Sequence, residues 1–235
     1  MGKVDKKIFA KNSSWTFNNI ANKFESHVEK SVPFYHEGHE LINGFSDFFI
    51  KDNSLVYDIG CSTGLLIKKL SKHHSKKKIK IIGIDSVSSM IKKAKKVNNK
   101  DKRSSFLIKD IEKYKFKKSS LITSYYTIQF IHPHVRQKII DKIYLSLHWG
   151  GAFILFEKVR GSDARFNDYM TQLYYDFKFK NGFSEEEIIN KSKSLKGILE
   201  PFSTKGNYDL LKRAGFKDIM TIFRWNNFEG IIAIK

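Results

Sequence analysis

The chain has 235 residues, of which 41% are hydrophobic, and its 43 Lys and Arg against 24 Asp and Glu give a formal net charge of +19. This length and apolar fraction suffice for one large domain that needs no disulfide or metal to hold its core. The single cysteine, Cys61, excludes an intramolecular disulfide framework. No run of about 18 apolar residues could cross a membrane, and no apolar segment after residues 1–7 resembles a secretory signal. We therefore expect a soluble, cytoplasmic protein.

The excess of positive charge invites a nucleic-acid interpretation, because basic surfaces attract phosphate backbones. Only six of the 43 basic residues are Arg, however, and Arg is the side chain that recognises phosphate and guanine in a bidentate manner. The Lys-rich runs at 75–80 and 91–96 fit solvated faces of regular elements. Nucleic acid is therefore a partner that the composition allows but does not favour.

Hydrophobic periodicity predicts strands alternating with helices through most of the chain. Apolar residues at helical spacing precede residue 48, and β-rich runs follow at 54–60, 78–84, 106–108, 120–126 and, after the turn Gly150-Gly151, 152–156. Helical patterns begin near 65, 90 and 136 between these runs. The region 163–199 is predicted to be helical, and a helix at 210–216 precedes two final strands at 218–225 and 228–235.

This alternation is typical of βαβ units and a parallel sheet covered on both faces. We predict an α/β fold with a doubly wound, mostly parallel, seven-stranded sheet of the Rossmann-like kind. Residues 1–235 form one domain, in which residues 1–48 and a helical insertion at 160–200 build a helical cap.

A glycine loop follows the first predicted strand, in the sequence Asp58-Ile59-Gly60-Cys61-Ser62-Thr63-Gly64. In open α/β sheets, ligands bind at the carboxyl ends of the strands, and glycines there let a ligand approach the backbone closely. Asp85 ends the second strand, roughly 20 residues after the loop, where a carboxylate can accept hydrogen bonds from the hydroxyls of a ribose. The loop therefore predicts a nucleoside site.

The spacing of the glycines narrows the choice of nucleoside. A dinucleotide loop needs a glycine where Ser62 stands, and a P-loop needs Lys-Ser or Lys-Thr after Gly64. Neither pattern is present, so we expect a ligand with ribose and adenine but no phosphate, namely S-adenosylmethionine. Asp110, at the end of the third strand, could accept from the adenine amino group, and the amide of Ile111 would face the ring edge.

The chain resembles the carboxy-S-adenosylmethionine synthase family, a branch of the class I methyltransferase-like fold, nearly from end to end. The stretches Ser31-Val32-Pro33-Phe34-Tyr35 and Asn181-Gly182-Phe183-Ser184-Glu185 are more particular to that family than the glycine loop is. Other similar segments are 15–17, 56–64, 84–85, 90–91, 110–111, 127–130, 141–144, 150–152, 157–158, 176–178 and 214–216.

The resemblance implies a homodimer whose active sites borrow from the neighbouring subunit, and a set of contacts to the cofactor. The contacts that it implies come from Tyr35, Gly60, Cys61, Ser62, Asp85, Ser86, Asp110 and Ile111. For Cys61, we expect the amide rather than the thiol to bind.

Two positions depart from the family pattern. The synthases hold the extra carboxylate of their product with an Arg where this chain has Ser192, and they carry an Asn where it has Tyr125. Loss of a bidentate Arg should cost about 2–5 kcal/mol of carboxylate recognition, and the neighbouring Lys193 lacks the planar fork that would replace it. We therefore expect methyl transfer from S-adenosylmethionine to a small acceptor, which could be anionic.

Two alternatives stay open. The first is a carboxy-S-adenosylmethionine synthase that uses prephenate and serves tRNA wobble-uridine modification, and the second is a non-catalytic module that binds nucleic acid through its Lys-rich surface. Incubation with S-adenosylmethionine and prephenate would separate synthase from methyltransferase.

Methyl transfer requires orientation and a dry, polar-lined pocket more than it requires acid–base groups. The candidates for the pocket walls are Trp15, Tyr35, Tyr125, Tyr126 and Gln129. An aromatic face near the sulfonium would add about 0.5–2 kcal/mol of cation–π attraction. Arg160 and Arg165 are candidates to hold an anionic acceptor, since nearly all other cations are Lys, and Arg224 is a third conspicuous guanidinium.

Two histidine motifs carry weaker predictions. The run His36-Glu37-Gly38-His39-Glu40 misses the metalloprotease spacing by one residue, so we expect helix-surface residues and no metal. His132-Pro133-His134 follows a strand and could hold a general base, although a polar loop explains it better.

Overall fold

The alternation expected from the sequence is present in the computed structural model, which describes residues 11–17 and 20–235. The helices are α1 (Phe24–Ser31), α2 (Tyr35–Ser46), α3 (Leu65–His73), α4 (Ser88–Val97), α5 (Pro133–Ser146), α6 (Ala164–Lys180), α7 (Glu185–Ser194) and α8 (Thr204–Ala214), with a short 3-10 turn at Ile128–Phe130. The strands are β1 (Leu55–Ile59), β2 (Lys80–Asp85), β3 (Ser104–Ile108), β4 (Ser119–Tyr125), β5 (Leu147–Lys158), β6 (Asp218–Trp225) and β7 (Phe228–Ile234).

The seven strands form one sheet in the order β3-β2-β1-β4-β5-β7-β6. The five strands from β3 to β5 are parallel to their neighbours, and β7 pairs antiparallel with both β5 and β6. Strand order reverses between β1 and β4, which places the ligand-binding end of the sheet at the carboxyl ends of these two strands. The predicted doubly wound, mostly parallel sheet is confirmed.

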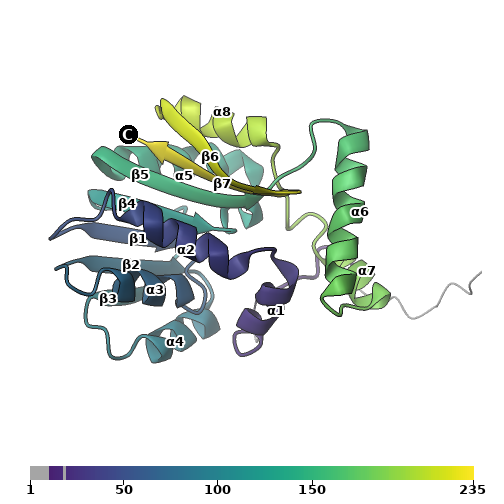
Figure 1. Ribbon diagram of the computed structural model, residues 1–235, viewed down its shortest axis with the longest axis horizontal. Coiled ribbons are helices and arrows are strands. Elements are labelled where there is room, and N and C mark those ends of the chain that lie inside the picture. Colours follow the sequence, from purple (N-terminus) through teal and green to yellow (C-terminus); the bar gives the residue numbers. More distant parts are fainter. Residues whose placement is uncertain (1–10, 18–19) are drawn as a thin grey trace, which may run out of the picture.

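Two apolar clusters cover the two faces of the sheet (Figure 1). On one face, Ile42 of α2, Leu66 and Leu70 of α3 and Ile91 of α4 pack against the strands. On the other face, α5 and α8 do the same, through residues such as Ile140 of α5. The strands are consequently apolar on both faces, as the continuous hydrophobic runs predict.

The N-terminal segment divides between the sheet and the cap. We predicted that residues 1–48 belong to the cap, but α2 lies on the sheet and buries Ile42 completely in its core. Helix α1 and the residues around Trp15 instead lie beside α6 and α7, beyond the carboxyl ends of the parallel strands (Figure 1). The cap over the ligand-binding edge therefore combines α1 with α6 and α7.

Element boundaries differ from the sequence prediction where polar residues open an element. Helix α5 begins at Pro133, with His132 as its N-cap, and α8 begins at Thr204, capped by Ser203. Strand β5 begins at Leu147, before Gly150-Gly151, because an irregularity in its pairing with β4 absorbs the turn that we expected to precede it. Among the described residues, no helix is long and apolar enough to span a membrane.

Candidate active site

A cavity of about 690 Å³ opens between the carboxyl ends of the central strands and the cap. Most of the residues singled out from the sequence line it: Trp15, Tyr35, Gly60, Cys61, Ser62, Asp85, Ser86, Asp110, Ile111, Tyr125, Tyr126, Gln129, Arg160 and Ser192. Arg165 does not. The topology thus brings the glycine loop, the strand-end carboxylates and the aromatic candidates to one place.

The glycine loop leaves β1 with a sharp turn. Gly60 has φ +69°, and a Cβ at this position would collide with the side chain of Thr127. The amides of Gly60 and Cys61 both donate to the carbonyl of Ile84, at 2.7 and 3.1 Å, which ties the loop to the end of β2. The N–H of Cys61 is thus already donated within the loop, and the contact of this residue with the cofactor stays a prediction.

Asp85 joins the loop to the turn that follows β2. One carboxylate oxygen, Oδ2, accepts from the Ser62 amide at 2.9 Å, and the other accepts from the Val87 amide at 2.8 Å. Each oxygen retains a further lone pair, and the residue lines the cavity. Burial raises the pKa of this carboxyl in spite of the amide hydrogen bonds. Hydrogen bonds from two ribose hydroxyls would stabilise its ionised form.

Asp58 is a carboxylate to which the sequence reasoning assigned no separate role. It is the penultimate residue of β1 and lines the cavity, is 2% exposed, and accepts a hydrogen bond from Thr123 Oγ1 at 2.8 Å. Burial raises the pKa of Asp58 to about 7. A buried carboxylate with one side-chain donor can hold a cationic group of a ligand, such as the ammonium of a methionine moiety.

Asp110 and Ser86 lie at the more open side of the cavity, and both are exposed. One oxygen of Asp110 accepts from the Glu112 amide at 2.8 Å, which shapes the turn after β3. The other oxygen is available for an exocyclic amino group, and Ile111 lies beside it in the lining. The contacts of Asp110 and Ile111 with an adenine edge stay a prediction.

Aromatic side chains close the cavity over β4. The hydroxyl of Tyr125 donates to the carbonyl of Tyr35 at 2.8 Å, and the two rings lie 5.5 Å apart. His39 packs against both, with ring centroids 4.7 Å from Tyr35 and 4.6 Å from Tyr125. His39 is 1% exposed, and burial lowers its pKa to about 3. The prediction that His39 lies on a helix surface is therefore wrong.

Tyr126 and Gln129 follow Tyr125 and differ in what they offer a ligand. The Tyr126 hydroxyl is buried without a hydrogen-bond partner among the described residues. The Gln129 amide is already used, since it donates to the Tyr126 carbonyl at 3.3 Å and accepts from the Lys158 amide at 2.8 Å. Gln129 thus positions the backbone of the cavity wall, while Tyr126 keeps a free donor.

Besides the exposed Lys109 and Lys196, three less exposed lysines line the same cavity, and the sequence reasoning missed them. Lys158 ends β5, Lys178 lies on α6 and Lys191 lies on α7; we call them the lysine cluster. Among the described residues, none of the three has a carboxylate oxygen within 4.0 Å. Burial is the main cause that lowers their pKa values, to about 7 for Lys158, about 8 for Lys178 and about 6 for Lys191.

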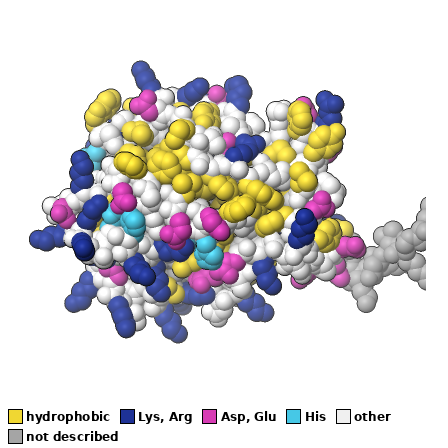
Figure 2. Space-filling model, in the orientation of Figure 1, with side chains coloured by type: hydrophobic (Ala, Val, Ile, Leu, Met, Phe, Trp, Pro, Cys, Tyr) yellow, Lys and Arg dark blue, Asp and Glu magenta, His cyan; other side chains and the backbone are white. Residues whose placement is uncertain are grey.

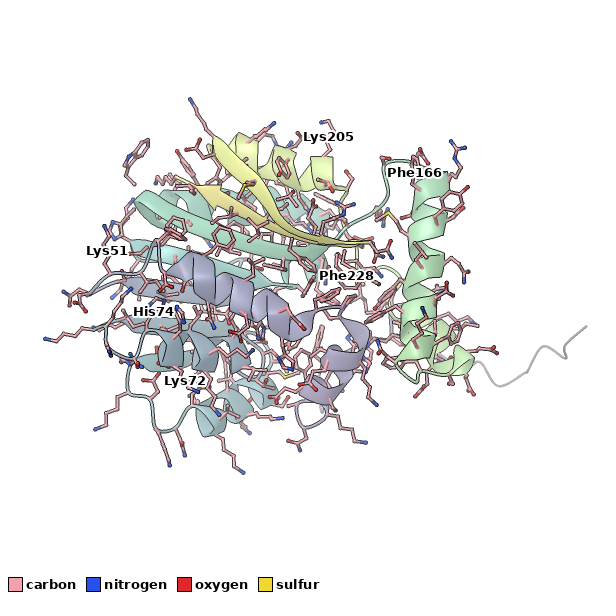
Figure 3. The ribbon with its side chains drawn as sticks, viewed as in Figure 1. Lys51, Lys72, His74, Phe166, Lys205 and Phe228 are labelled. Carbon is pink, nitrogen blue, oxygen red and sulfur yellow. The ribbon has the colours of Figure 1, made fainter. Side chains whose placement is uncertain are left out.

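The ammonium groups of the lysine cluster lie over aromatic rings instead of pairing with carboxylates of the described residues. Lys158 Nζ lies 4.1 Å and Lys178 Nζ 4.8 Å from the centroid of Tyr174, and Lys191 Nζ lies over the ring of Trp15. Trp15 also has a buried Nε1 without a partner among the described residues. Figure 3 shows Phe228, which lies 5.8 Å from Lys158 Nζ, between the sheet and α6.

Comparisons with known proteins fit this architecture. A family model described as a methyltransferase domain matches residues 56–151, which include the glycine loop and Asp85. A carboxy-S-adenosyl-L-methionine synthase from Staphylococcus epidermidis is 46% identical over 94% of this chain and 97% of its own length. A protein of the same name from Nautilia profundicola is 39% identical over 92% of each chain. This chain belongs to the carboxy-S-adenosyl-L-methionine synthase family.

Solved structures show that this chain has the class I methyltransferase fold. The S-adenosylmethionine-dependent methyltransferase SibL has a TM-score of 0.60 at 12% identity, over 86% of this chain and 55% of that one. Phosphoethanolamine N-methyltransferase 2 from Haemonchus contortus, solved with S-adenosyl-L-methionine, also scores 0.60 at 16% identity, over 83% of this chain and 52% of that one. The chain is an S-adenosylmethionine-dependent transferase, and the non-catalytic interpretation is set aside.

The residues present fit S-adenosylmethionine. The turn at Gly60 has no room for a Cβ, Asp85 has lone pairs free for a ribose, and Asp58 offers a buried negative charge. The cofactor predicted from the glycine spacing is therefore the one that the family uses, and these carboxylates are the residues that would hold it.

At Ser192 this chain lacks the Arg that the synthases carry, and the structure shows what surrounds this position. Ser192 lies on α7 and lines the cavity, next to Lys191 of the lysine cluster. Lys193, the neighbour that we considered as a substitute for the synthase Arg, does not line it. Of the two lysines that flank Ser192 in the sequence, Lys191 therefore lines the cavity and Lys193 does not.

The three conspicuous arginines separate in the structure. Arg160 is exposed and lines the cavity, while its amide donates to the Phe202 carbonyl at 3.0 Å. Arg165 is exposed in the first turn of α6, with its guanidinium 5.8 Å from the ring of Phe166, at the end of the helix away from α7 (Figure 3). Arg224 pairs with Glu229 at 3.0 Å. Of the three, only Arg160 can contact an acceptor in this cavity.

Of the residues in the two histidine motifs, His39 lines the cavity, whereas His36, His132 and His134 do not. His36 pairs with Glu29 at 3.0 Å on the surface, and His132 and His134 lie at the start of α5, outside the cavity lining. The described residues do bring Asp47, His73 and His74 together, with potential ligand atoms within 4.8 Å of one another, outside the cavity lining. We expected no metal from the sequence, and this group was not recognised there.

Proposed function

We propose that this chain is a carboxy-S-adenosyl-L-methionine synthase that transfers a carboxylate from prephenate to S-adenosylmethionine. The observation that carries the proposal is the 46% identity to a protein of that name over 94% of this chain and 97% of the relative. An identity of this size over the whole length includes the cap as well as the cofactor loop. This was the alternative to methyl transfer in the sequence reasoning, and it is now the better supported of the two.

The distribution of charge in the cavity supports a reaction between a cation and an anion. Carboxylates lie on the cofactor side, at Asp58, Asp85 and Asp110, and ammonium groups lie on the cap side. When bound, S-adenosylmethionine supplies a sulfonium whose methyl carbon takes up the carboxylate, while the methyl proton and the ring hydroxyl of prephenate leave as water and phenylpyruvate remains. The residues of this chain orient the two molecules and keep bulk water away.

Three aromatic residues would exclude water from the reacting atoms. Tyr125 and Tyr35 are joined by a hydrogen bond across the cavity wall, and Tyr126 packs against Tyr125 with ring centroids 4.7 Å apart. In a cavity lined in this way, electrostatic interactions are stronger than in water. A ring near the sulfonium would add about 0.5–2 kcal/mol of cation–π attraction.

Methyl transfer from S-adenosylmethionine to a small acceptor, which could be anionic, remains the second candidate function. The observation that favours it is Ser192, which has no guanidinium to grip an extra carboxylate on the product. Arg160 is the cation that would then hold an anionic acceptor at the mouth of the cavity.

One incubation distinguishes these functions. Purified protein is mixed with S-adenosylmethionine and prephenate, and the adenosyl products and phenylpyruvate are measured by mass spectrometry. The synthase proposal expects S-adenosylmethionine enlarged by one CO₂, together with an equal amount of phenylpyruvate. Asp85→Ala, which removes the carboxylate from the cofactor side, should abolish both products. Recovery of unchanged S-adenosylmethionine with wild-type protein under these conditions would refute the proposal.

A further inference from the structure

We propose that the lysine cluster is the carboxylate-binding subsite of this enzyme. The cluster would hold the carboxylates of a small dianionic substrate, and then the carboxylate of the product, in place of the guanidinium that is absent at Ser192. This inference rests on the proposed synthase function, but it concerns residues whose ligand binding can be measured without turnover.

The first support is convergence from three separate elements. Lys158 comes from the end of β5, Lys178 from the last turn of α6 and Lys191 from α7, yet all three line one cavity. Contacts between rings connect them. Lys178 Nζ lies 4.8 Å from Tyr174 and 5.8 Å from Phe183, Phe183 lies 5.7 Å from His27, and His27 stacks on the Trp15 ring beneath Lys191. The ammonium groups therefore border a continuous wall.

The second support is that the ammonium groups of the lysine cluster have no carboxylate partner among the described residues. Lys178 is 7% exposed, and it faces ring systems with no carboxylate oxygen within 4.0 Å among the described residues. Burying an ammonium in this way is costly, and like charges nearby add to the cost. Lys178 lowers the pKa values of Lys158 and Lys191 by its charge, which places the three groups within electrostatic reach. An anion in the cavity would supply the missing counter-charge to all of them.

The third support is the pattern of side chains along α7. Lys191 and Leu195, four residues apart, line the cavity together with Ser192, whereas Lys193 does not. Residues four apart share one face of a helix, so Lys191 belongs to the face turned toward the cavity. Trp15 carries the buried indole N–H without a partner beside Lys191, and this group could donate to a carboxylate oxygen.

Three lysine ammonium groups can take the place of one arginine guanidinium in binding a carboxylate. An Arg binds a carboxylate through two parallel hydrogen bonds, whereas each Lys donates from a single rotatable ammonium. Several lysines around one cavity can surround two carboxylates of one substrate, which a lone guanidinium cannot do. The loss of Arg at Ser192 therefore does not by itself exclude a carboxylated ligand from this site.

The test is equilibrium binding of prephenate to protein saturated with S-adenosylhomocysteine, measured by isothermal titration calorimetry. We expect Lys178→Met and Lys191→Met each to raise the dissociation constant for prephenate by about 10- to 100-fold, because each removes a charged donor. Their affinity for S-adenosylhomocysteine should change by less than about threefold. Lys180→Met on α6 and Lys193→Met on α7, which lie outside the cavity lining, are the matched controls and should bind prephenate like wild type.

A second variant separates anion binding from a structural role. In the Lys191→Met background, Ser192→Arg returns a cation to the same side of the cavity, and it should recover at least tenfold of the lost prephenate affinity. Equal prephenate binding by wild type, Lys178→Met and Lys191→Met would overturn the subsite while leaving the synthase proposal intact. Lysine-dependent prephenate binding without any carboxylated product would support the subsite and refute the proposed reaction.

Discussion

At the scale of single residues, the position of Asp58 in the fold determines its burial and its pKa. Its place near the end of β1 leaves it buried, with one side-chain donor from Thr123 and a pKa raised to about 7. A ligand ammonium beside it would favour the ionised carboxylate. Below that pKa the carboxyl must first lose a proton, so binding of S-adenosylmethionine should weaken as the pH falls.

We therefore predict that the dissociation constant for S-adenosylmethionine falls about tenfold between pH values of roughly 6 and 8, because one proton is released on binding. Asp58→Asn should weaken binding and remove most of this pH dependence. Titration calorimetry in two buffers of different ionisation enthalpy measures both the affinity and the released proton. An unchanged pH profile in Asp58→Asn would assign the effect to Asp85, whose pKa is also raised.

At the scale of elements, the cap helices carry ionisable groups with the opposite sign of pH effect. Lys178 on α6 and Lys191 on α7 have pKa values of about 8 and about 6, lowered first by burial. The neighbouring charged groups are His27 of α1, whose pKa is lowered to about 4, together with Glu187 of α7 and Lys196, which follows α7. As the pH rises through these values, the lysines lose the charge that an anion needs.

The expected outcome is that prephenate affinity decreases as the pH rises from roughly 6 to 9, and that bound anion takes up protons. The Lys178→Met variant should show a shallower dependence because one titrating ammonium is gone. The same calorimetric buffer pairs report the uptake of protons. Prephenate affinity that increases with pH in wild-type protein would contradict the assignment of these helices to anion binding.

At the scale of the whole molecule, the charge of +19 is spread over the surface. On the face shown in Figure 2, Lys and Arg side chains stand around the outline with Asp and Glu among them, and apolar side chains gather over the middle and toward α6. Helix α6 exposes Phe166, Tyr169 and Leu173 along one face, at 49%, 58% and 57% of their surface. Large exposed apolar groups in a row indicate an interface.

We predict a homodimer, as the family resemblance implied, with α6 in its interface. Tyr169→Glu together with Leu173→Glu should shift the protein from dimer to monomer, because two buried carboxylates would lack partners. Light scattering coupled to size-exclusion chromatography measures the mass. Leu145→Glu, at a residue exposed to 65% on α5, is the matched control and should leave the mass unchanged. A wild-type mass equal to one chain would contradict the prediction.

Much of the fold and half of the site were predictable from the sequence, because both depend on local patterns. Alternating apolar runs predicted each strand. Asp85 ends β2, Gly60 directly follows β1 and Asp110 follows β3 by two residues, and a parallel sheet brings these strand ends to one edge. Boundaries were predicted less well, because polar caps such as Ser203 and the irregularity before β5 interrupt the hydrophobic pattern.

The sequence by itself thus determined the doubly wound sheet and the side of the cavity that holds the cofactor. Only the tertiary structure decided which of 43 basic residues matter. Lys191 faces the cavity and Lys193 does not, although both lie on α7 two residues apart. A helix turns by about 100° per residue, so neighbours point in different directions, and Lys158 and Lys178 join Lys191 only when β5, α6 and α7 meet.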